Sequence, residues 1–187
     1  ARGRRVVDVG FGTGEHLAYL AGRGAVIHGL EVEAELVAWG RRRFPAYGAN
    51  IRQGSMSEAS SVFAGARFDM ALLVGNTLAH AADAAEARRT LREMARLTAG
   101  GGALVASVVN YDRILGRGVT ELPVLRGRTA DGRAWEFRRS YDLSGAPGRI
   151  LFRTSLVAEE ETVEGCHALT PILRGDLAAA AGEAFEQ

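Results

Sequence analysis

Residues 6–15 read Val6-Val7-Asp8-Val9-Gly10-Phe11-Gly12-Thr13-Gly14-Glu15. This pattern predicts a short buried strand, a turn of Gly-x-Gly-x-Gly form and the first turn of a helix. Glycines allow positive φ values, and a ligand can lie against their backbone without meeting a Cβ atom. The helix that follows offers unpaired N–H groups and the positive end of its dipole. Together these features predict a cradle for a nucleoside-bearing cofactor at the carboxyl edge of an α/β sheet.

Two acidic residues bear on the identity of that cofactor. The dinucleotide fingerprint G-x-G-x-x-G/A needs a small residue at position 15, and Glu15 stands there, which argues against a nicotinamide-binding oxidoreductase. Glu31 ends a second expected strand, one βαβ unit after the turn, where a carboxylate can accept hydrogen bonds from both ribose hydroxyls. The alternative for Glu31 is a solvated acid that caps the next helix, because Glu33 and Glu35 follow it directly.

Composition limits the class of protein. The chain has 187 residues, of which 47% are apolar and 24% charged, as in an ordinary globular domain with a sizeable core. The net charge of +1 argues against a nucleic-acid partner held by counterion release, and every basic residue is an arginine, which excludes lysine chemistry. Cys166 is the only cysteine, and no apolar run approaches about 20 residues, so we expect no membrane partner and a cytoplasmic location.

Strands and helices alternate through the first 109 residues. Strands are expected at 5–9, 25–31, 50–53, 68–74 and 103–109, and helices at 15–21, 34–43 and 83–98. The run Gly100-Gly101-Gly102 is expected to end the last of these helices. Five strands separated by helical segments predict the α/β class, with a doubly wound, mostly parallel, Rossmann-like sheet.

The period changes to two between about residues 126 and 170. Apolar side chains alternate with polar ones from Trp135 to Leu143, a turn follows at 144–148, and a strand returns from Phe152 to Ala158. Residues 163–169 can form a third strand, and a helix is expected at 174–185. We therefore expect a single domain over residues 1–187, with an antiparallel β insertion after strand five at about 126–170.

Four segments resemble known motifs. The glycine turn preceded by Asp8 resembles motif I of the class I S-adenosylmethionine-dependent methyltransferases. Gly54-Ser55-Met56 resembles the Gly-Asp-Met that follows their third strand, and Val74-Gly75-Asn76-Thr77-Leu78-Ala79-His80 resembles their fourth motif. The segment Gly101-Gly102-Ala103-Leu104-Val105, followed by Asn110-Tyr111-Asp112, resembles the glycine/sarcosine N-methyltransferase group, and the β insertion is similar to that group's. The resemblance covers most of residues 6–185.

The resemblance implies S-adenosyl-L-methionine as cofactor and a small molecule, through an amine nitrogen, as methyl acceptor. Glycines of the turn would pass under the methionine portion, Glu31 would take the ribose, and Val32, Ser55 and Met56 would surround the adenine. The implied cofactor residues are Asp8, Gly10, Phe11, Gly12, Thr13, Gly14, Glu31, Val32, Ser55, Met56 and Gly75. Methyl transfer from a sulfonium is an in-line displacement that gains its rate from positioning, so no covalent nucleophile is required.

The acceptor side of the site is also implied by the resemblance. Asn76 would orient the amine, and Asn110, Tyr111 and Arg139 would complete the substrate set. His80 could relay a proton from the acceptor, or could pack or cap instead; Tyr111 could close over the acceptor or fill core. Arg139 could clamp a carboxylate or form a surface salt bridge. The other histidines, His16, His28 and His167, do not share metal-ligand spacing, so we expect structural roles for them and no metal.

Two positions depart from the family pattern. Ser55 replaces the usual acid, which should weaken adenine recognition. Val109 replaces the arginine that holds the substrate carboxylate in glycine-methylating members, and an apolar side chain cannot act as a bidentate guanidinium. Glycine is therefore a doubtful acceptor, and a less acidic or bulkier amine is favoured. The alternative function is a cofactor-binding domain without turnover, acting as a scaffold or regulatory partner.

The family's helical lid before the first strand and its final strand pair have no counterpart in these 187 residues. This favours a fragment, or a domain whose lid comes from another subunit. Uncovered sheet edges would favour pairing into a homo-oligomer.

Overall fold

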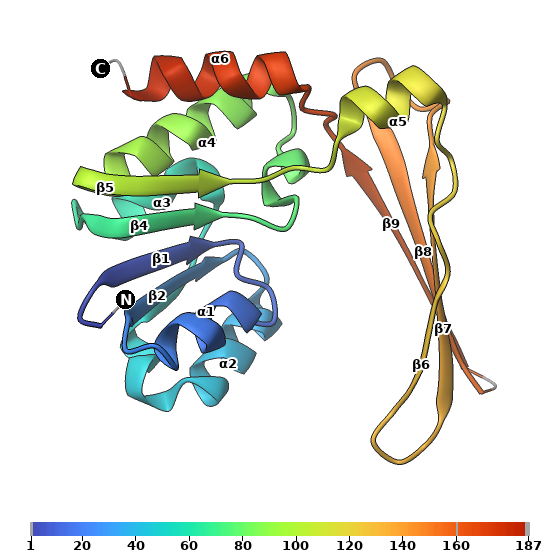
Figure 1. The fold of residues 1–187 in the computed structure, drawn as a ribbon, viewed down its shortest axis with the longest axis horizontal. Coiled ribbons are helices and arrows are strands. Elements are labelled where there is room, and N and C mark those ends of the chain that lie inside the picture. Colours follow the sequence, from blue (N-terminus) through green and yellow to red (C-terminus); the bar gives the residue numbers. More distant parts are fainter. Residues whose placement is uncertain (1, 160, 186–187) are drawn as a thin grey trace.

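The computed structural model describes residues 2–159 and 161–185, which form two separate β-sheets joined by helices (Figure 1). The first sheet contains β1 (Arg5–Val9), β2 (Val26–Glu31), β3 (Ile51–Gln53), β4 (Phe68–Leu73) and β5 (Thr98–Ala106). The second contains β6 (Leu125–Arg128), β7 (Ala134–Asp142), β8 (Ile150–Ala158) and β9 (Glu161–Leu169). The helices are α1 (Glu15–Ala21), α2 (Ala34–Arg43), α3 (Ala59–Val62), α4 (Ala84–Leu97), α5 (Tyr111–Arg117) and α6 (Arg174–Phe185). Short 3₁₀ turns are η1 (Pro45–Asn50), η2 (Met56–Glu58) and η3 (Thr77–His80).

The first sheet is parallel, in the order β3-β2-β1-β4-β5. Its central strand, β1, pairs with β2 on one side and β4 on the other, so the order of the strands reverses at β1. In an open sheet of this kind, the crevice outside the carboxyl ends of the strands at such a reversal is where ligands bind. The predicted doubly wound α/β fold is therefore confirmed, and it places the glycine turn at that crevice.

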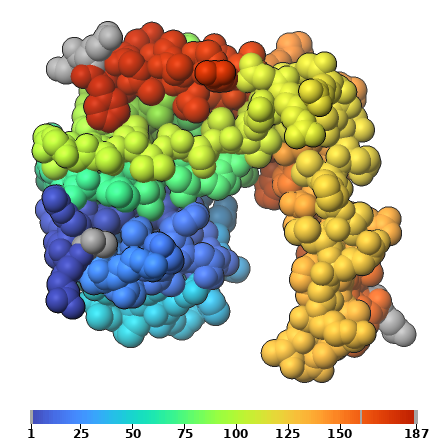
Figure 2. Space-filling model, in the orientation of Figure 1, coloured from blue at the N-terminus to red at the C-terminus, as the bar shows by residue number. Residues whose placement is uncertain are grey.

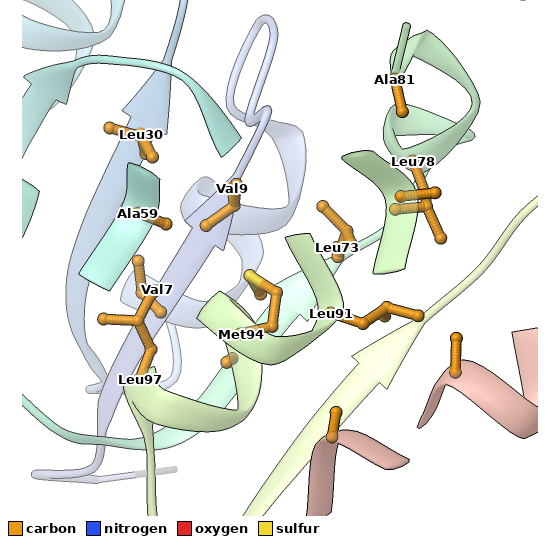
Figure 3. Packing of buried hydrophobic residues seen from close by; sticks show 14 of the residues in the cluster. Val7, Val9, Leu30, Ala59, Leu73, Leu78, Ala81, Leu91, Met94 and Leu97 are labelled. Atoms are coloured by element: carbon orange, nitrogen blue, oxygen red, sulfur yellow. The ribbon is translucent and has the colours of Figure 1, made fainter. Parts of the chain in front are cut away.

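Helices cover both faces of this sheet. Alternate residues of β1 enter different cores: Val7 and Val9 pack with α3, α4 and α6, whereas Val6 packs with α1 and α2. Figure 3 shows the first of these cores, in which Leu91, Met94 and Leu97 of α4 face the strands. Burial on both faces explains why the central strands are apolar almost throughout.

The start of β5 differs from the sequence prediction. Helix α4 ends at Leu97, and Gly100, Gly101 and Gly102 lie inside β5 rather than at the end of the helix. Between the pairs Phe68↔Thr98 and Met70↔Ala103, the register shifts, because five steps along β5 oppose two along β4. A Cβ on Gly102 would lie 2.9 Å from the carbonyl oxygen of Ala99, so this bulge requires glycine there.

The second sheet is an antiparallel meander in the order β6-β7-β8-β9, and α5 leads into it from β5. The predicted insertion is confirmed, and β6 adds a strand before the three that were expected. Register pairs such as Phe137↔Leu156 and Phe152↔His167 place the apolar side chains on one shared face. The space-filling view shows a wide hollow between this sheet and the α/β part (Figure 2). None of the described helices is both long and apolar enough to cross a bilayer.

Candidate functional site

The glycine turn lies between β1 and α1 and depends on two close approaches. Gly10 has φ +74°, and a Cβ there would lie 2.3 Å from Cγ2 of Thr77, which belongs to the loop after β4. Gly14 has φ +82° and precedes α1, and a Cβ there would lie 2.8 Å from the ring of Phe44. Any larger side chain at either position would push the turn away from its neighbours. The glycine turn therefore packs closely against the loop that follows β4 and against the C-terminal end of α2.

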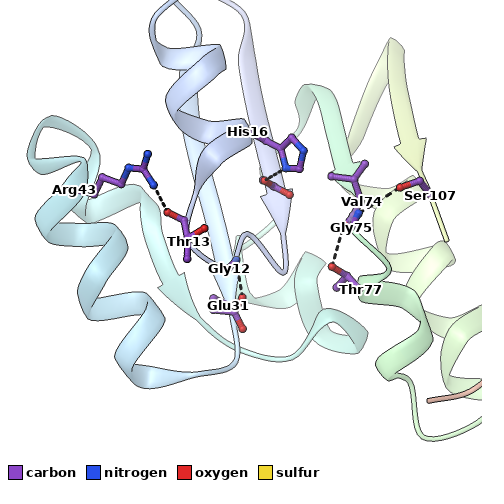
Figure 4. Close-up of polar contacts among 10 residues, drawn as sticks. Gly12, Thr13, His16, Glu31, Arg43, Val74, Gly75, Thr77 and Ser107 are labelled. Carbon is purple, nitrogen blue, oxygen red and sulfur yellow. Dashed lines mark hydrogen bonds and ion pairs between the residues drawn. The ribbon is translucent and has the colours of Figure 1, made fainter. Parts of the chain in front are cut away.

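Glu31 ends β2 and faces this turn. Its carboxylate accepts a hydrogen bond from the amide of Gly12 at 3.0 Å (Figure 4). It also accepts hydrogen bonds from the amides of Val32 at 2.8 Å and Glu33 at 3.3 Å. The residue is only 7% exposed. The bonds to Val32 and Glu33 satisfy the N–H groups of the two residues that precede α2, which is close to the capping role considered for Glu31. The same side chain also lines a cavity.

That cavity has a volume of about 480 Å³ and lies at the carboxyl ends of the strands. Its size falls in the range of small-molecule and cofactor sites. Its wall consists of Val9, Gly10, Leu30, Glu31, Val32, Glu33, Leu36, Gly54, Ser55, Met56, Gly75, Thr77, His80, Glu86 and His167. The predicted cofactor residues Gly10, Glu31, Val32, Ser55, Met56 and Gly75 are therefore brought together in one wall.

The other predicted cofactor residues lie outside this wall. Phe11 is buried in the core, where a Cβ on Gly29 or Gly40 would come within 2.9 Å of its ring. The carbonyl oxygen of Thr13 accepts hydrogen bonds from Trp39 Nε1 and Arg43 Nη1. Gly12 meets Glu31 through its amide, and Gly14 begins α1.

Arg43 ties α2 to the start of α1. Besides its bond to Thr13, its guanidinium pairs with the Glu15 carboxylate at 2.7 and 3.2 Å. This bidentate pair lowers the pKa of Glu15 through the hydrogen bond and charge of Arg43. The residue that distinguishes this turn from a dinucleotide fingerprint therefore helps to fix the turn in place.

Asp8 is a buried carboxylate beside the glycine turn. It is 1% exposed, and neither oxygen has a hydrogen-bond partner among the residues that the structure describes. The Nδ1 atom of His16 lies 3.7 Å from Oδ2 of Asp8, within ion-pair distance when the imidazole is protonated. Burial, and then the charge of Glu31, raise the pKa of Asp8 to about 7. A buried carboxylate without hydrogen-bond partners is costly, so it suits a ligand that supplies a cation or a hydrogen-bond donor.

Asn76 and Tyr111 bind each other. The Nδ2 of Asn76 lies 2.9 Å from the Tyr111 hydroxyl, and its Oδ1 lies 3.1 Å from both that hydroxyl and the amide of Val109. Tyr111 is wholly buried, and burial raises its pKa to about 12. Of its two predicted roles, the structure shows core filling. Asn76 lies beside the cavity wall and connects it to the segment after β5.

Asn110 and Arg139 are engaged elsewhere in the fold. The Oδ1 of Asn110 accepts the Arg113 amide at 2.9 Å and so caps α5. The Nη2 of Arg139 donates to the Pro123 carbonyl at 3.0 Å, and its Cζ lies 5.6 Å from the centre of the Phe137 ring. Neither residue lines the cavity. Arg139 therefore forms a backbone contact in place of the predicted carboxylate clamp or salt bridge.

His80 does line the cavity, and beside it stands His167. Their ring centres are 5.9 Å apart, with the planes at 71°. His28, in contrast, packs edge-on against Phe63 and Phe68, as its expected structural role requires. His167, for which a structural role was also expected, lies in the cavity wall. The alternation of apolar and polar residues predicts which side chains lie on the same face of a strand, but not which part of the protein that face contacts.

These residues fit S-adenosylmethionine. Glu31 lines the cavity with a carboxylate suited to ribose hydroxyls, and Val32, Ser55 and Met56 line it with a mixed polar and apolar surface of the kind that an adenine ring would need. The Gly10 backbone admits a close approach that a Cβ would block, and the Asp8 carboxylate beside it has no hydrogen-bond partner among the described residues. Other members of the wall, among them Leu36, Thr77, Glu86 and His167, were not predicted as site residues, because only the fold brings them to this edge.

Comparisons with known proteins agree with this site. Residues 6–102 match the model of a family described as "Methyltransferase domain". The chain is 30% identical over 129 residues to glycine N-methyltransferase of Oryctolagus cuniculus, a match that covers 62% of the chain and 44% of that relative. It is 34% identical over 90 residues to the dTDP-3-amino-3,6-dideoxy-alpha-D-glucopyranose N,N-dimethyltransferase of Streptomyces fradiae, covering 48% of the chain and 33% of that enzyme. The matches thus span less than half the length of these curated relatives.

Similar folds occur among solved structures. The sugar N-methyltransferase KedS8 from Streptoalloteichus superposes with a TM-score of 0.76 at 24% identity, covering 97% of this chain and 71% of that one. CalS10, an amino pentose methyltransferase from Micromonospora echinaspora solved with S-adenosylmethionine bound, superposes with a TM-score of 0.72 at 23% identity, covering 97% and 75%. At these identities the likeness concerns the fold. The family model itself spans more than half of the chain, which therefore belongs to the class I S-adenosylmethionine-dependent methyltransferases.

Proposed function

We propose that this domain binds S-adenosylmethionine in the 480 Å³ cavity and directs its methyl group to an amine nitrogen of a small molecule. The observation that carries the proposal is the composition of one wall. It joins the Glu31 carboxylate, the Gly10 and Gly75 backbone and the His80 imidazole at the carboxyl ends of neighbouring strands. The same wall can therefore bind a nucleoside and a sulfonium group and can place a proton acceptor, His80, beside them.

The cofactor, when bound, supplies a methyl group on a positively charged sulfur, which needs no further activation. The chain's own task is to align the amine with that methyl group and to exclude water, and such positioning can contribute roughly 7–11 kcal/mol. Glu31 fixes the nucleoside end, because its carboxylate is itself held by backbone amides. His80 lies on the wall where it can take a proton from the amine.

The acceptor that we favour is a bulkier amine, with an amino sugar as the first choice. Val109 has an apolar side chain at the position where glycine-methylating members of the resembled group have an arginine. The carboxylate of a small amino acid would therefore lack its guanidinium partner. The names of two similar proteins, the Streptomyces fradiae enzyme and KedS8, describe N-methylation of sugars. The strand register places Trp135 and Phe137 on the same face of the antiparallel sheet as His167, which lines the cavity. The hollow between this sheet and the α/β part could receive a larger acceptor (Figure 2).

Methyl transfer from labelled S-adenosylmethionine to a panel of amines tests this function. The panel contains glycine, sarcosine, nucleotide-linked amino sugars and simple alkyl amines. We expect transfer to at least one amino sugar and little to glycine. Robust turnover of glycine or sarcosine would refute the argument from Val109. Transfer to none of the amines, together with tight binding of S-adenosylhomocysteine, would favour the second candidate below.

That second candidate is a cofactor-binding domain without turnover. The observation in its favour is that polar groups of Asn76, Asn110, Tyr111 and Arg139, the predicted acceptor residues, already have partners within the fold. An acceptor would have to displace these bonds or use other groups. Pairing of two copies of the chain stays a prediction under either function.

A further inference from the structure

His80 and His167 approach each other from different sheets. His80 ends η3, directly after the parallel strand β4, and His167 lies on β9 of the antiparallel sheet. Their rings meet edge to face at 5.9 Å, and both line the cavity. We propose that His167 is a positioning residue for His80, so that the two imidazoles act as one proton-accepting unit toward the acceptor amine. This inference rests on the proposed function.

The backbone around the pair is fixed on both sides. The Thr170 amide donates to the Ala79 carbonyl at 2.8 Å, and its hydroxyl donates to the Ala81 carbonyl at 2.7 Å. The Arg149 guanidinium bridges the same two segments, donating to the carbonyls of Ala81, Ala82 and Ala168. Figure 1 shows the end of β9 beside the loop that follows β4. The meeting of the two rings is therefore held by bonds within three residues of each histidine.

Two imidazoles this close do not readily carry a charge at the same time, because like charges disfavour each other's protonated form. The pKa of His80 lies below its usual value, through desolvation by the surrounding protein first and then through the charges of His167 and Arg149. Glu31 opposes this effect, and Glu33 and Glu86 also stand in the cavity wall. A pKa held below the usual histidine value favours the neutral imidazole, whose nitrogen lone pair can accept a proton.

The proton balance of the reaction requires such an acceptor. An aliphatic amine reaches the site mainly as its ammonium form, which has no free lone pair. The ammonium nitrogen gives one proton to the His80 imidazole, and its freed lone pair then forms the N–C bond to the methyl carbon as the C–S bond breaks toward sulfur. The proton on His80 afterwards leaves to water, which restores the neutral imidazole.

Two substitutions of opposite charge test the pairing. His167→Gln removes the neighbouring charge and should raise the pKa of His80, whereas His167→Arg makes that charge permanent and should lower it, each by about half a unit. The pKa is measured by NMR titration of histidine ring signals in the protein with S-adenosylhomocysteine, with the His80 signal identified by its loss in His80→Gln. A merely structural role for His167 would not produce shifts of opposite sign.

Cys166→Gln and Cys166→Arg are the matched controls, because Cys166 precedes His167 on β9 and points to the other face of the sheet. They should leave the His80 titration unchanged. Shifts of the same sign in both His167 variants, or shifts below about 0.2 units, would overturn the inference. If the amide spectrum shows that His167→Arg does not fold, the test is the difference in the His80 pKa between His167→Gln and Cys166→Gln. The titration needs no methyl acceptor, so it can contradict the coupling of the two histidines independently of whether methyl transfer is observed. Where transfer occurs, the acid limb of the pH profile of kcat/KM should shift with the His80 pKa measured by NMR.

Discussion

The Oε2 atom of Glu31 lies 3.0 Å from the amide nitrogen of Gly12, which joins the end of β2 to the glycine turn after β1. The other oxygen accepts the amides of Val32 and Glu33. One carboxylate therefore holds the turn, supports the approach to α2 and lines the cavity. The two roles considered for Glu31, ribose binding and capping, are compatible, because a carboxylate has about four lone-pair sites.

Glu31→Gln should weaken binding of S-adenosylhomocysteine about 10- to 100-fold. The substitution removes the charge that strengthens hydrogen bonds from ribose hydroxyls, which are worth on the order of 1.5–3 kcal/mol each. Isothermal titration calorimetry measures the affinity, and the unfolding midpoint shows whether the turn survives. Glu35→Gln, an exposed change in the first turn of α2, is the control. Unaltered affinity in a folded Glu31→Gln protein would contradict the ribose role.

Asp8→Asn should change how stability depends on pH. The native pKa of Asp8 is raised from 3.8 to about 7, so between these values the folded state holds a proton that the unfolded state has released. This contribution is complete below about pH 4 and is lost as the pH rises toward 7, by at most about 4 kcal/mol. Relative to the wild type, Asp8→Asn should therefore become more stable across that window in urea unfolding at several pH values.

Asp69→Asn serves as the control for that experiment. Hydrogen bonds from the Arg5 amide and the Arg4 side chain lower the pKa of Asp69, so its titration lies below the window. The slope of stability between pH 4 and 7 should stay that of the wild type. If Asp8→Asn also kept this slope, the raised pKa of Asp8 would be wrong.

Local signals were sufficient to predict most elements. The bounds of β1, α1, α2 and α6 agree with the predicted ranges, because glycines, acidic first turns and apolar periodicity mark their ends. Prediction failed at Gly100–Gly102, where three glycines form a bulge within β5 instead of stopping a helix, since the pairing partner β4 decides the outcome. Side-chain roles were harder still. Nothing local in the sequence distinguishes an Asn110 that caps α5 from one that contacts a substrate.

Ser55→Asp should tighten binding of S-adenosylhomocysteine several-fold. Ser55 lines the cavity, and its Oγ accepts the Ser57 amide at the start of η2, a capping bond that aspartate can also form. The new carboxylate would add a charged acceptor for the adenine amine. Calorimetry against Ser61→Asp, which adds the same charge at an exposed position of α3, separates the contact from a general charge effect. Weaker or equal affinity would count against the placement of adenine beside Ser55.

Two glycine substitutions in helices should have opposite effects. Alanine is favoured over glycine in a helix by about 1 kcal/mol, and nothing lies within 4 Å of a Cβ placed on Gly182 in α6. Gly182→Ala should therefore stabilise the protein. In α2, a Cβ on Gly40 would lie 2.9 Å from the Phe11 ring, so Gly40→Ala should destabilise it by about 1–3 kcal/mol despite the better propensity. If denaturant unfolding showed that both changes stabilise the protein equally, the Phe11 ring would be able to move away from the new Cβ without loss of stability.

Arg149→Met should loosen the antiparallel sheet from the α/β part. The guanidinium donates to three carbonyl oxygens and to the Thr170 hydroxyl, and its loss leaves those acceptors to find water. Two of these contacts, to the Ala81 carbonyl and the Thr170 hydroxyl, are partly buried, and hydrogen bonds to a charged group contribute about 1.5–3 kcal/mol each, so we expect a loss of a few kcal/mol in unfolding free energy. Arg153→Met is the matched control: its partner is Asp142, at 3.3 Å on an exposed strand face, and such pairs contribute about 1 kcal/mol or less. Faster amide hydrogen exchange at Thr170 and His167 should accompany the Arg149 change alone. Equal losses in the two variants would show that Arg149 adds no more than a surface charge, and that the packing of Tyr141, Ile150 and Leu169 holds the two sheets together without it.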